Sequence, residues 1–311
     1  MDNRLAGGSP RWRRFKKTVL RNWMLYLFIL PSFVYILVFH YFPIYGIQIA
    51  FRNYKPSRGI WGSQWAGLKY FRKFLTSYNA WTILRNTIVI SLYQMLAFPV
   101  PILLALVLHY TPILRLKKIT QSITYAPHFI STVVLCGIIT AFFSQSGIIN
   151  QLGRILFGAQ AVDYMSYPRY WRSLFVGSGI WQNTGYNAII YIAALAGVSS
   201  ELHEAAIMDG ANRVQRIWHI DIPSIMPTII ILLIMQCGKV MNVGFQKAYL
   251  LQNDLNTSVS EVISTYVYKM GLNKGQYSLS TAVGLFNNVI NFTLVILVNK
   301  AANKLSGSGL W

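Results

Sequence analysis

The sequence predicts an all-α, polytopic membrane protein with six transmembrane helices. Its 311 residues are 54% hydrophobic and only 12% charged, whereas soluble domains carry about 25% charged residues. Long apolar runs recur along the whole chain, and each approaches the roughly 20 residues that a helix needs to cross a bilayer. Basic residues gather in the short segments between these runs. A water-soluble fold would have too little charge to cover its surface.

The first apolar run, 23–43, predicts the first span. A signal peptide would have a shorter apolar region and a cleavage site of small residues. This run instead ends in the aromatic stretch 39–43, which is typical of a membrane interface. We therefore expect an uncleaved helix after a cytoplasmic tail, 1–22. The tail carries seven basic residues: Arg4, Arg11, Arg13, Arg14, Lys16, Lys17 and Arg21.

Five further spans are expected within a core domain, 82–300, which follows an external loop, 44–81. Pro99 and Pro101 lie inside the second span. Prolines are tolerated in membrane helices when neighbouring groups satisfy the freed carbonyls, so we expect a kink or break there. A cytoplasmic tail, 301–311, ends the chain. The five predicted spans are 83–108, 121–143, 173–197, 225–247 and 279–299.

Six spans place both termini and the loops near 109–120 and 198–224 in the cytoplasm. These short segments are rich in Lys and Arg, as the positive-inside rule requires. The external segments are also basic, with six Lys and Arg and no acid in 44–81, which works against this topology. Such a surface would concentrate anionic solutes. Contact with lipid headgroups or with an anionic partner protein would explain the same charges.

The segment 199–223 is a polar island between two apolar runs and holds four of the eight acidic residues. Ser199 or Ser200 can cap the start of a helix, and Gly210 is placed to end it in a left-handed conformation. A second short helix is expected from 211 to about 219, before Pro223 stops it. This helix–Gly–helix unit would suit a docking surface, although an ordinary amphipathic loop has the same spacing.

The same segment resembles the EAA loop of ABC transporter permeases. Glu204-Ala205-Ala206 is followed by Asp209-Gly210-Ala211 and then by Ile220-Asp221-Ile222-Pro223; the family pattern has Leu where Ile222 stands. The resemblance implies a type I ABC importer permease fold. It also implies that a coupling helix fits a cleft in a cytoplasmic ATPase. The residues assigned to this coupling are Glu204, Ala205, Ala206, Asp209 and Gly210.

Segments 42–51 and 59–63 resemble the subgroup of permeases that take up polysaccharides and oligosaccharides. In this family two permeases pair, each docks an ATPase subunit, and an external solute-binding protein delivers the sugar. The resemblance thus implies a multi-pass protein of the bacterial cytoplasmic (inner) membrane. Its expected partners are a second, different permease and two cytoplasmic ATPase subunits that hold ATP and Mg²⁺.

Polar residues inside three predicted spans indicate a substrate pathway, because such residues usually face a bundle interior or a wet cavity. In each helix they fall within an arc of about 100–140°. Amides and hydroxyls can pair with sugar hydroxyls, aromatic faces can stack on sugar rings, and Lys239 can meet a carboxylate. Hydrogen bonding between helices is the alternative role. The candidates are Trp181, Gln182, Asn183, Tyr186 and Asn187; Gln236, Lys239, Asn242 and Gln246; and Asn287, Asn288 and Asn291.

Motifs for chemistry are absent from the sequence. It has no G-x-x-x-x-G-K-[ST] phosphate loop, so we expect no ATP or other cofactor on this chain. It has no H-E-x-x-H or C-x-x-C, its five histidines are scattered, and Cys136 and Cys237 lie in apolar runs. We therefore expect a subunit without catalytic activity or a bound metal.

Together these observations predict an importer subunit for oligosaccharides, with acidic, uronate-type substrates such as alginate or pectin fragments favoured by the basic external loops and Lys239. An ion-coupled secondary sugar transporter is the main alternative, but it would need acids in the membrane and the predicted spans hold none. A membrane-embedded enzyme would need acidic or metal-binding clusters. The net charge of +20 also raises nucleic-acid binding, but the charge lies between apolar spans, so we expect no nucleic-acid partner.

Overall fold

The computed structural model describes residues 17–307, 309 and 310. This part of the chain is mostly helical, and its only extended pairings are two isolated bridges, Arg52 to Trp65 and Lys55 to Gly59. The predicted all-α fold is confirmed. Residues 1–16 of the predicted basic tail lie outside the described residues.

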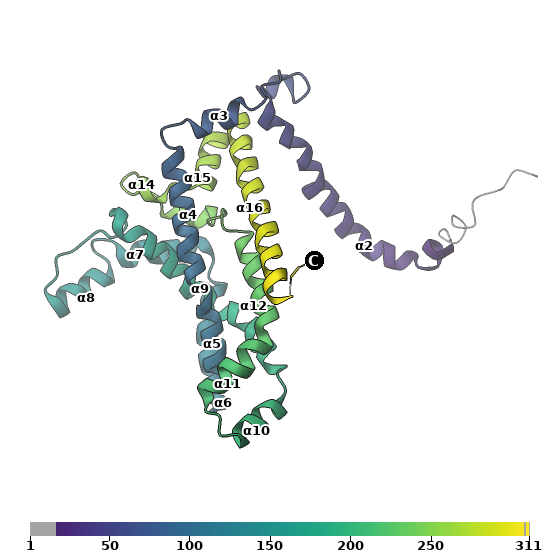
Figure 1. The fold of residues 1–311 in the computed structure, drawn as a ribbon. Helices are drawn as coiled ribbons and strands as arrows, with labels where there is room; N and C mark the ends of the chain where they lie inside the picture. Colours follow the sequence, from purple (N-terminus) through teal and green to yellow (C-terminus); the bar gives the residue numbers. More distant parts are fainter. Residues whose placement is uncertain (1–16, 308, 311) are drawn as a thin grey trace, which may run out of the picture.

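The first predicted span forms helix α2, Trp23–Ile36, which has no buried residue. A π-helical turn, Leu37–Tyr41, and a 3-10 helix, Phe42–Phe51, extend it. The predicted external loop is therefore helical where it begins, because the apolar run continues to Phe51. Figure 1 shows α2 diverging from the other helices. An apolar helix exposed on all sides must be covered by lipid or by another protein.

The segment after this helix, which belongs to the predicted external loop 44–81, is held against the last helix. Pro56–Arg58 and helix α3, Lys69–Leu75, are short helical pieces. The guanidinium of Arg52 lies 5.5 Å and 5.8 Å from the ring centres of Trp61 and Trp65. Ser278 anchors the segment to the last helix, since its hydroxyl accepts from the Tyr54 N–H and donates to the Arg52 carbonyl.

The second predicted span is broken where its prolines lie, as expected. Helix α4, Ala80–Leu96, ends before helix α5, Pro99–Tyr110, begins. The third predicted span is not one helix. It is divided into α6, Leu114–Tyr125, a 3-10 turn, Ala126–Phe129, and α7, Thr132–Phe143. Pro127 removes an N–H donor at this division, which favours a break. Helix α8, Ile148–Phe157, follows.

Helix α9, Pro168–Ala196, contains the fourth predicted span and packs along α5. Gly185 lets α6 cross α9 closely, because a Cβ at this position would clash with the Thr124 carbonyl. Trp171 is fully buried at the other end of α9, and its Nε1–H donates to the Leu251 carbonyl at 2.9 Å. These contacts make α9 the central support of the helical body.

The fifth predicted span starts and ends earlier than expected. A short helix α11, Arg213–Arg216, a π-helical turn, Ile217–Asp221, and helix α12, Ile222–Cys237, form one continuous helix. The prediction that Pro223 stops the second short helix is therefore wrong. Pro223 lies in the first turn of α12, where its missing N–H is tolerated, and the wider π-helical turn before it shifts the hydrogen-bond register.

After Cys237 the chain is irregular over 238–244 and then forms helix α13, Phe245–Leu251. Short helices α14, Thr257–Ser260, and α15, Ile263–Tyr268, and a π-helical turn, Lys269–Asn273, lead into α16, Tyr277–Ser306. Irregular backbone inside a membrane protein is tolerated where protein buries it or where it lines a cavity. We therefore expect the irregular backbone of 238–244 either to be buried by protein or to line a cavity.

Five helical stretches of the described chain are long and apolar enough to cross a membrane. The fourth predicted span is not among them, although α9 has 29 residues, because polar residues interrupt its apolar surface. The five stretches are Trp23–Phe51, Ala80–Tyr110, Thr132–Phe157, Arg213–Cys237 and Tyr277–Lys304.

Candidate functional site

The polar island forms helix α10, Ser200–Met208, at the end of the molecule opposite α3 (Figure 1). The Ser199 hydroxyl caps it by accepting from the Glu201 N–H at 3.2 Å. Gly210 has a φ of +80°. Its N–H bonds the Ile207 carbonyl at 3.0 Å, while the Ala211 N–H bonds the Ala206 carbonyl at 2.8 Å. This pair of bonds is a Schellman motif, so the predicted left-handed cap is confirmed.

A second local unit reverses the chain after Gly210. Asn212 and Gln215 form a reciprocal capping box, with bonds of 2.7 Å and 2.9 Å. The loop therefore satisfies its own helix ends with hydrogen bonds between near neighbours. Such a unit can hold its shape while projecting from the helical body.

The surface that α10 presents is mixed. Glu204, Ala205, Asp209 and Gly210 are exposed, and Ala206 is half-buried. Three large apolar side chains accompany them: Leu202 and Ile207 are about half exposed and Met208 is 87% exposed. Sequence reasoning singled out the motif but missed these three residues, which an apolar count on this short helix would have found. Apolar side chains bordered by charges are typical of a surface that another protein covers.

The inner side of α10 contacts the helical body through polar groups. His203 Nε2 lies 3.2 Å from Asp221 Oδ1, and Tyr110 Oη donates to Asp221 Oδ2 at 2.6 Å. Asp221 is fully buried within the continuous helix 213–237, although the sequence placed it in a loop. Through Asp221, helix α10 is thus connected to α5 and to the π-helical turn that leads into α12.

A polar cavity of about 450 Å³ lies between α4, α5, α9 and α12. Four of the predicted pathway residues line it: Asn183, Asn187, Gln236 and Lys239. Gln94 and Thr184 also line it and were not predicted. None of the described lining residues is acidic. The cavity supplies amides, the hydroxyls of Thr184 and Tyr191, and a cation in a wall that is otherwise apolar.

The prediction that the polar residues of the fifth span share one face of a helix is wrong. These residues are Gln236, Lys239, Asn242 and Gln246. The prediction assumed a helix through 247, whereas α12 ends at Cys237, so Lys239, Asn242 and Gln246 are not spaced by helical turns. The irregular segment brings Lys239 to the cavity as an exposed side chain. Lys247, which was not predicted, is more buried and donates to the Phe175 carbonyl at 2.7 Å.

Asn287 and Asn291 of α16 support the irregular segment. Asn287 donates to Asn242 Oδ1 at 2.8 Å, and Asn291 Oδ1 accepts from the Met241 N–H at 3.0 Å. These bonds join α16 to the irregular segment 238–244, so both asparagines act here as structural hydrogen-bond partners. Neither residue lines the cavity, and Asn288 on the same helix is exposed.

The remaining candidates on α9 lie outside the cavity. Gln182 donates to the Ile130 carbonyl at 2.9 Å, and Trp181 is 53% exposed. Tyr186 stacks on His128, with ring centroids 3.8 Å apart, and His128 Nδ1 lies 3.1 Å from Asn183 Oδ1. His128 thus orients a cavity residue, a role the sequence did not indicate.

Known proteins resemble this chain over nearly its whole length. It is 42% identical to Protein LplB of Bacillus subtilis, over 98% of this chain and 96% of that protein. It is 40% identical to the polygalacturonan/rhamnogalacturonan transport system permease protein YteP of the same organism, over 96% of this chain and 94% of that protein.

The fold matches a crystal structure of a bacterial ABC transporter involved in the import of the acidic polysaccharide alginate. The TM-score is 0.87 at 34% identity, covering 94% of this chain and 99% of that chain. A second structure, of a bacterial alginate ABC transporter with an alginate pentasaccharide-bound periplasmic protein, matches with the same TM-score and covers 96% of this chain.

Residues 97–306 match the family model of the binding-protein-dependent transport system inner membrane component. This match includes helices α5 to α16, every lining residue of the cavity except Gln94, and the loop that carries α10. The chain therefore belongs to the family of binding-protein-dependent transport system inner membrane components, and it is a multi-pass ABC permease.

Proposed function

We propose that this chain is a permease subunit of an ATP-driven importer of acidic oligosaccharides in the bacterial cytoplasmic membrane. The observation that carries the substrate class is the cavity, which combines Lys239 with amide side chains and has no acid among its described lining residues. A carboxylate would find a charge partner there, and sugar hydroxyls would find amide donors and acceptors.

Two further cations, Arg172 and Lys247, lie on the side of the cavity that we assign to the exterior in this proposal. Arg172 donates to Asn86 Oδ1 at 2.8 Å, and Lys247 contacts the ring of Phe175 at 4.8 Å. No ion pair within the described residues involves either side chain. Unneutralised cations favour an anionic solute. The relative that transports polygalacturonan and rhamnogalacturonan and the alginate importer support the same substrate class.

The partners follow from the family and the exposed surfaces. In this proposal α10 seats Glu204, Ala205 and Gly210 in a cleft of one of two cytoplasmic ATPase subunits, which hold ATP and Mg²⁺. A second, different permease covers part of the exposed apolar surface, and an external solute-binding protein delivers the oligosaccharide. Closure of the ATPase dimer would draw the coupling helices together and rock the helical bodies around the cavity.

The test is uptake into proteoliposomes that contain the assembled importer and its binding protein. We expect ATP-dependent uptake of labelled oligouronates, with competition by other oligouronates and little competition by neutral oligosaccharides of equal length. Uptake of neutral sugars without competition by uronates would contradict the substrate class. Ion-driven uptake without ATP would favour a secondary transporter and contradict the proposal as a whole.

A further inference from the structure

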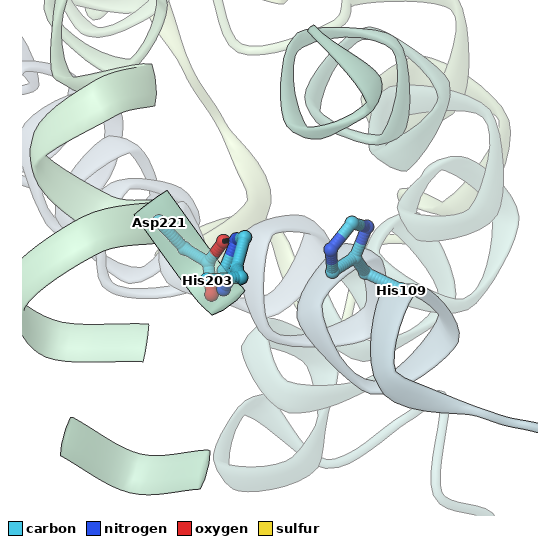
Figure 2. Close-up of side chains that lie close together, drawn as sticks. All are labelled: His109, His203 and Asp221. Atoms are coloured by element: carbon cyan, nitrogen blue, oxygen red, sulfur yellow. Dashed lines mark ion pairs between the residues drawn. The ribbon is translucent and has the colours of Figure 1, made fainter. Parts of the chain in front are cut away.

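Three side chains that the transport proposal does not use gather behind the coupling helix. His109 is near the end of α5, His203 is on α10, and Asp221 ends the π-helical turn before α12. One potential ligand atom from each lies within 4.8 Å of the other two. Figure 2 shows His203 and Asp221 side by side, with His109 facing them from α5.

The closest pair in this cluster is near but not hydrogen-bonded. His203 Nε2 and Asp221 Oδ1 are 3.2 Å apart, within ion-pair distance, yet both atoms are buried and neither has a hydrogen-bond partner among the residues that the structure describes. Asp221 is 0% exposed, and an unsatisfied buried carboxylate oxygen is costly. This oxygen therefore requires a positive partner, which is either a protonated His203, paired with it at this distance, or a bound cation.

The 3.2 Å separation of His203 Nε2 and Asp221 Oδ1 is close to the spacing of two ligand atoms on one zinc ion. Zn–N and Zn–O bonds of about 2.0–2.2 Å in a tetrahedron place neighbouring ligand atoms about 3.3–3.5 Å apart. In that arrangement the lone pairs of the two atoms point at a shared third position and not at each other. This geometry explains a short contact between His203 and Asp221 that is not a hydrogen bond.

The surroundings of Asp221 also suit a ligand. Its second oxygen accepts a hydrogen bond of 2.6 Å from Tyr110 Oη. Metal-ligating carboxylates are commonly oriented by such a bond to their other oxygen. Tyr110 therefore fixes the carboxylate and leaves Oδ1 directed to the cluster.

We propose that His109, His203 and Asp221 form a Zn²⁺ site that holds coupling helix α10 against α5 and α12. Two imidazoles and one carboxylate are a ligand set that zinc accepts, and water can fill the fourth position. The His109 nitrogen would have to approach by up to about 1.5 Å to reach ligand spacing. The ion would join α10 and the π-helical turn Ile217–Asp221 to α5, which lies much earlier in the chain.

Nearby positively charged side chains would weaken the binding of Zn²⁺, so the test must distinguish a bound ion from a protonated His203. The Arg216 guanidinium lies 5.6 Å from the ring centre of Tyr110, and Arg213 and Lys117 also contribute positive potential to this region. A proton on His203 could neutralise Asp221 instead of a metal. The two cases differ in one respect, because only the metal needs His109.

The experiment titrates Co²⁺, a spectroscopic substitute for Zn²⁺, into the assembled importer in lipid nanodiscs, purified without a polyhistidine tag and stripped with a chelator. We expect the wild type to bind one more Co²⁺ per copy of this chain than the His109→Gln importer, with the visible absorption of a tetrahedral site. Zn²⁺ should displace it. The His203→Gln variant should also lose this site, and His219→Gln, on an exposed histidine of the same loop, should retain it.

Equal titrations of wild type and His109→Gln would overturn the site and leave the protonated pair. His109 is partly exposed, so the variant should keep its fold, which the metal-free unfolding temperature checks. Amide hydrogen exchange gives a second readout: Zn²⁺ should slow exchange across 200–208 in the wild type but not in His109→Gln. Unchanged exchange on Zn²⁺ binding would overturn the clamping role. Neither measurement depends on which sugar is transported.

Discussion

The loop 198–224, which carries α10 and is called the coupling loop below, and the polar cavity are built in opposite ways. The loop satisfies its helix ends with bonds between residues two to five apart, such as Ser199 to Glu201 and Ala211 to Ala206. The residues that line the cavity come from four helices and from the irregular segment 238–244. Asn291, which is 50 residues from Met241, holds this segment by a hydrogen bond. The loop is therefore a rigid local unit that can transmit motion, whereas the cavity depends on the relative positions of helices that can move.

This contrast predicts that single changes in the loop disconnect transport from ATP hydrolysis, while single changes around the cavity alter substrate recognition or stability. Five substitutions test it, from the largest expected effect to the smallest.

Gly210→Pro should have the largest effect on transport. Proline fixes φ near −65°, whereas Gly210 requires +80°, so the Schellman motif is lost and the presentation of α10 changes. We expect uptake to fall more than about tenfold, corresponding to about 1.4 kcal/mol or more, while ATP hydrolysis continues. Glu204→Lys should uncouple in the same direction by reversing a charge at the ATPase surface.

The matched control for Gly210 is Gly158→Pro, at the left-handed end of helix α8, where φ is +62°. It imposes the same backbone conflict away from the coupling loop, so ATP hydrolysis and uptake should remain linked. Equal uncoupling by both prolines would show that the effect is general destabilisation.

Lys239→Gln should weaken recognition of the substrate. A hydrogen bond to a charged group contributes about 1.5–3 kcal/mol, so KM for an oligouronate should rise by about 10- to 100-fold with a small change in ATPase coupling. The control is Lys118→Gln, which removes an equal charge from exposed α6. An unchanged KM for the uronate in Lys239→Gln would separate Lys239 from the substrate.

Asn291→Leu should destabilise the irregular segment. It removes the acceptor of the buried Met241 N–H, and an unsatisfied buried donor costs about 1–3 kcal/mol. The unfolding midpoint in detergent should fall, and substrate affinity should fall with it. Asn288→Leu, on an exposed position of the same helix, should leave the midpoint within error. Equal stability of the two variants would show that the Asn291 bond does not support the segment.

Ser199→Ala should have the smallest effect. Loss of an N-cap side chain costs about 1 kcal/mol, and here the bond is long, 3.2 Å, and exposed. Local hydrogen exchange in 200–203 should increase, while uptake should fall less than about twofold. Ser224→Ala, whose exposed hydroxyl bonds a helical carbonyl at 2.6 Å, is a control outside the cap. A loss of uptake as large as that of Gly210→Pro would contradict the ranking.

The coupling loop could be predicted from the sequence because its signals are local. Ser199, Gly210 and the acidic motif each act on neighbours within a turn, so their spacing determines the cap and the Schellman motif. The break at Pro99 was predictable for the same reason. The prediction that Pro223 ends a helix was wrong because the π-helical turn before it cannot be recognised from the residue types alone.

The cavity could be predicted only in part. Periodicity placed Asn183 and Asn187 on one surface of α9 correctly, since that helix is unbroken. It failed beyond Cys237, because the end of α12 is set by bonds from α16 to Met241 and Asn242. These bonds depend on how α16 packs against 238–244, and the spacing of residues within one segment does not reveal that packing.

The central claim is that α10 faces the cytoplasm and receives the motion of an ATPase. The most direct measurement is labelling of Ala205→Cys with a membrane-impermeant maleimide in intact cells and in inverted vesicles. Ala205 is exposed, and the two native cysteines, Cys136 and Cys237, are buried, so background should be low. The account predicts labelling in inverted vesicles that the bound ATPase subunit blocks, and none in intact cells. Labelling of Ala205→Cys from outside the cell would contradict it.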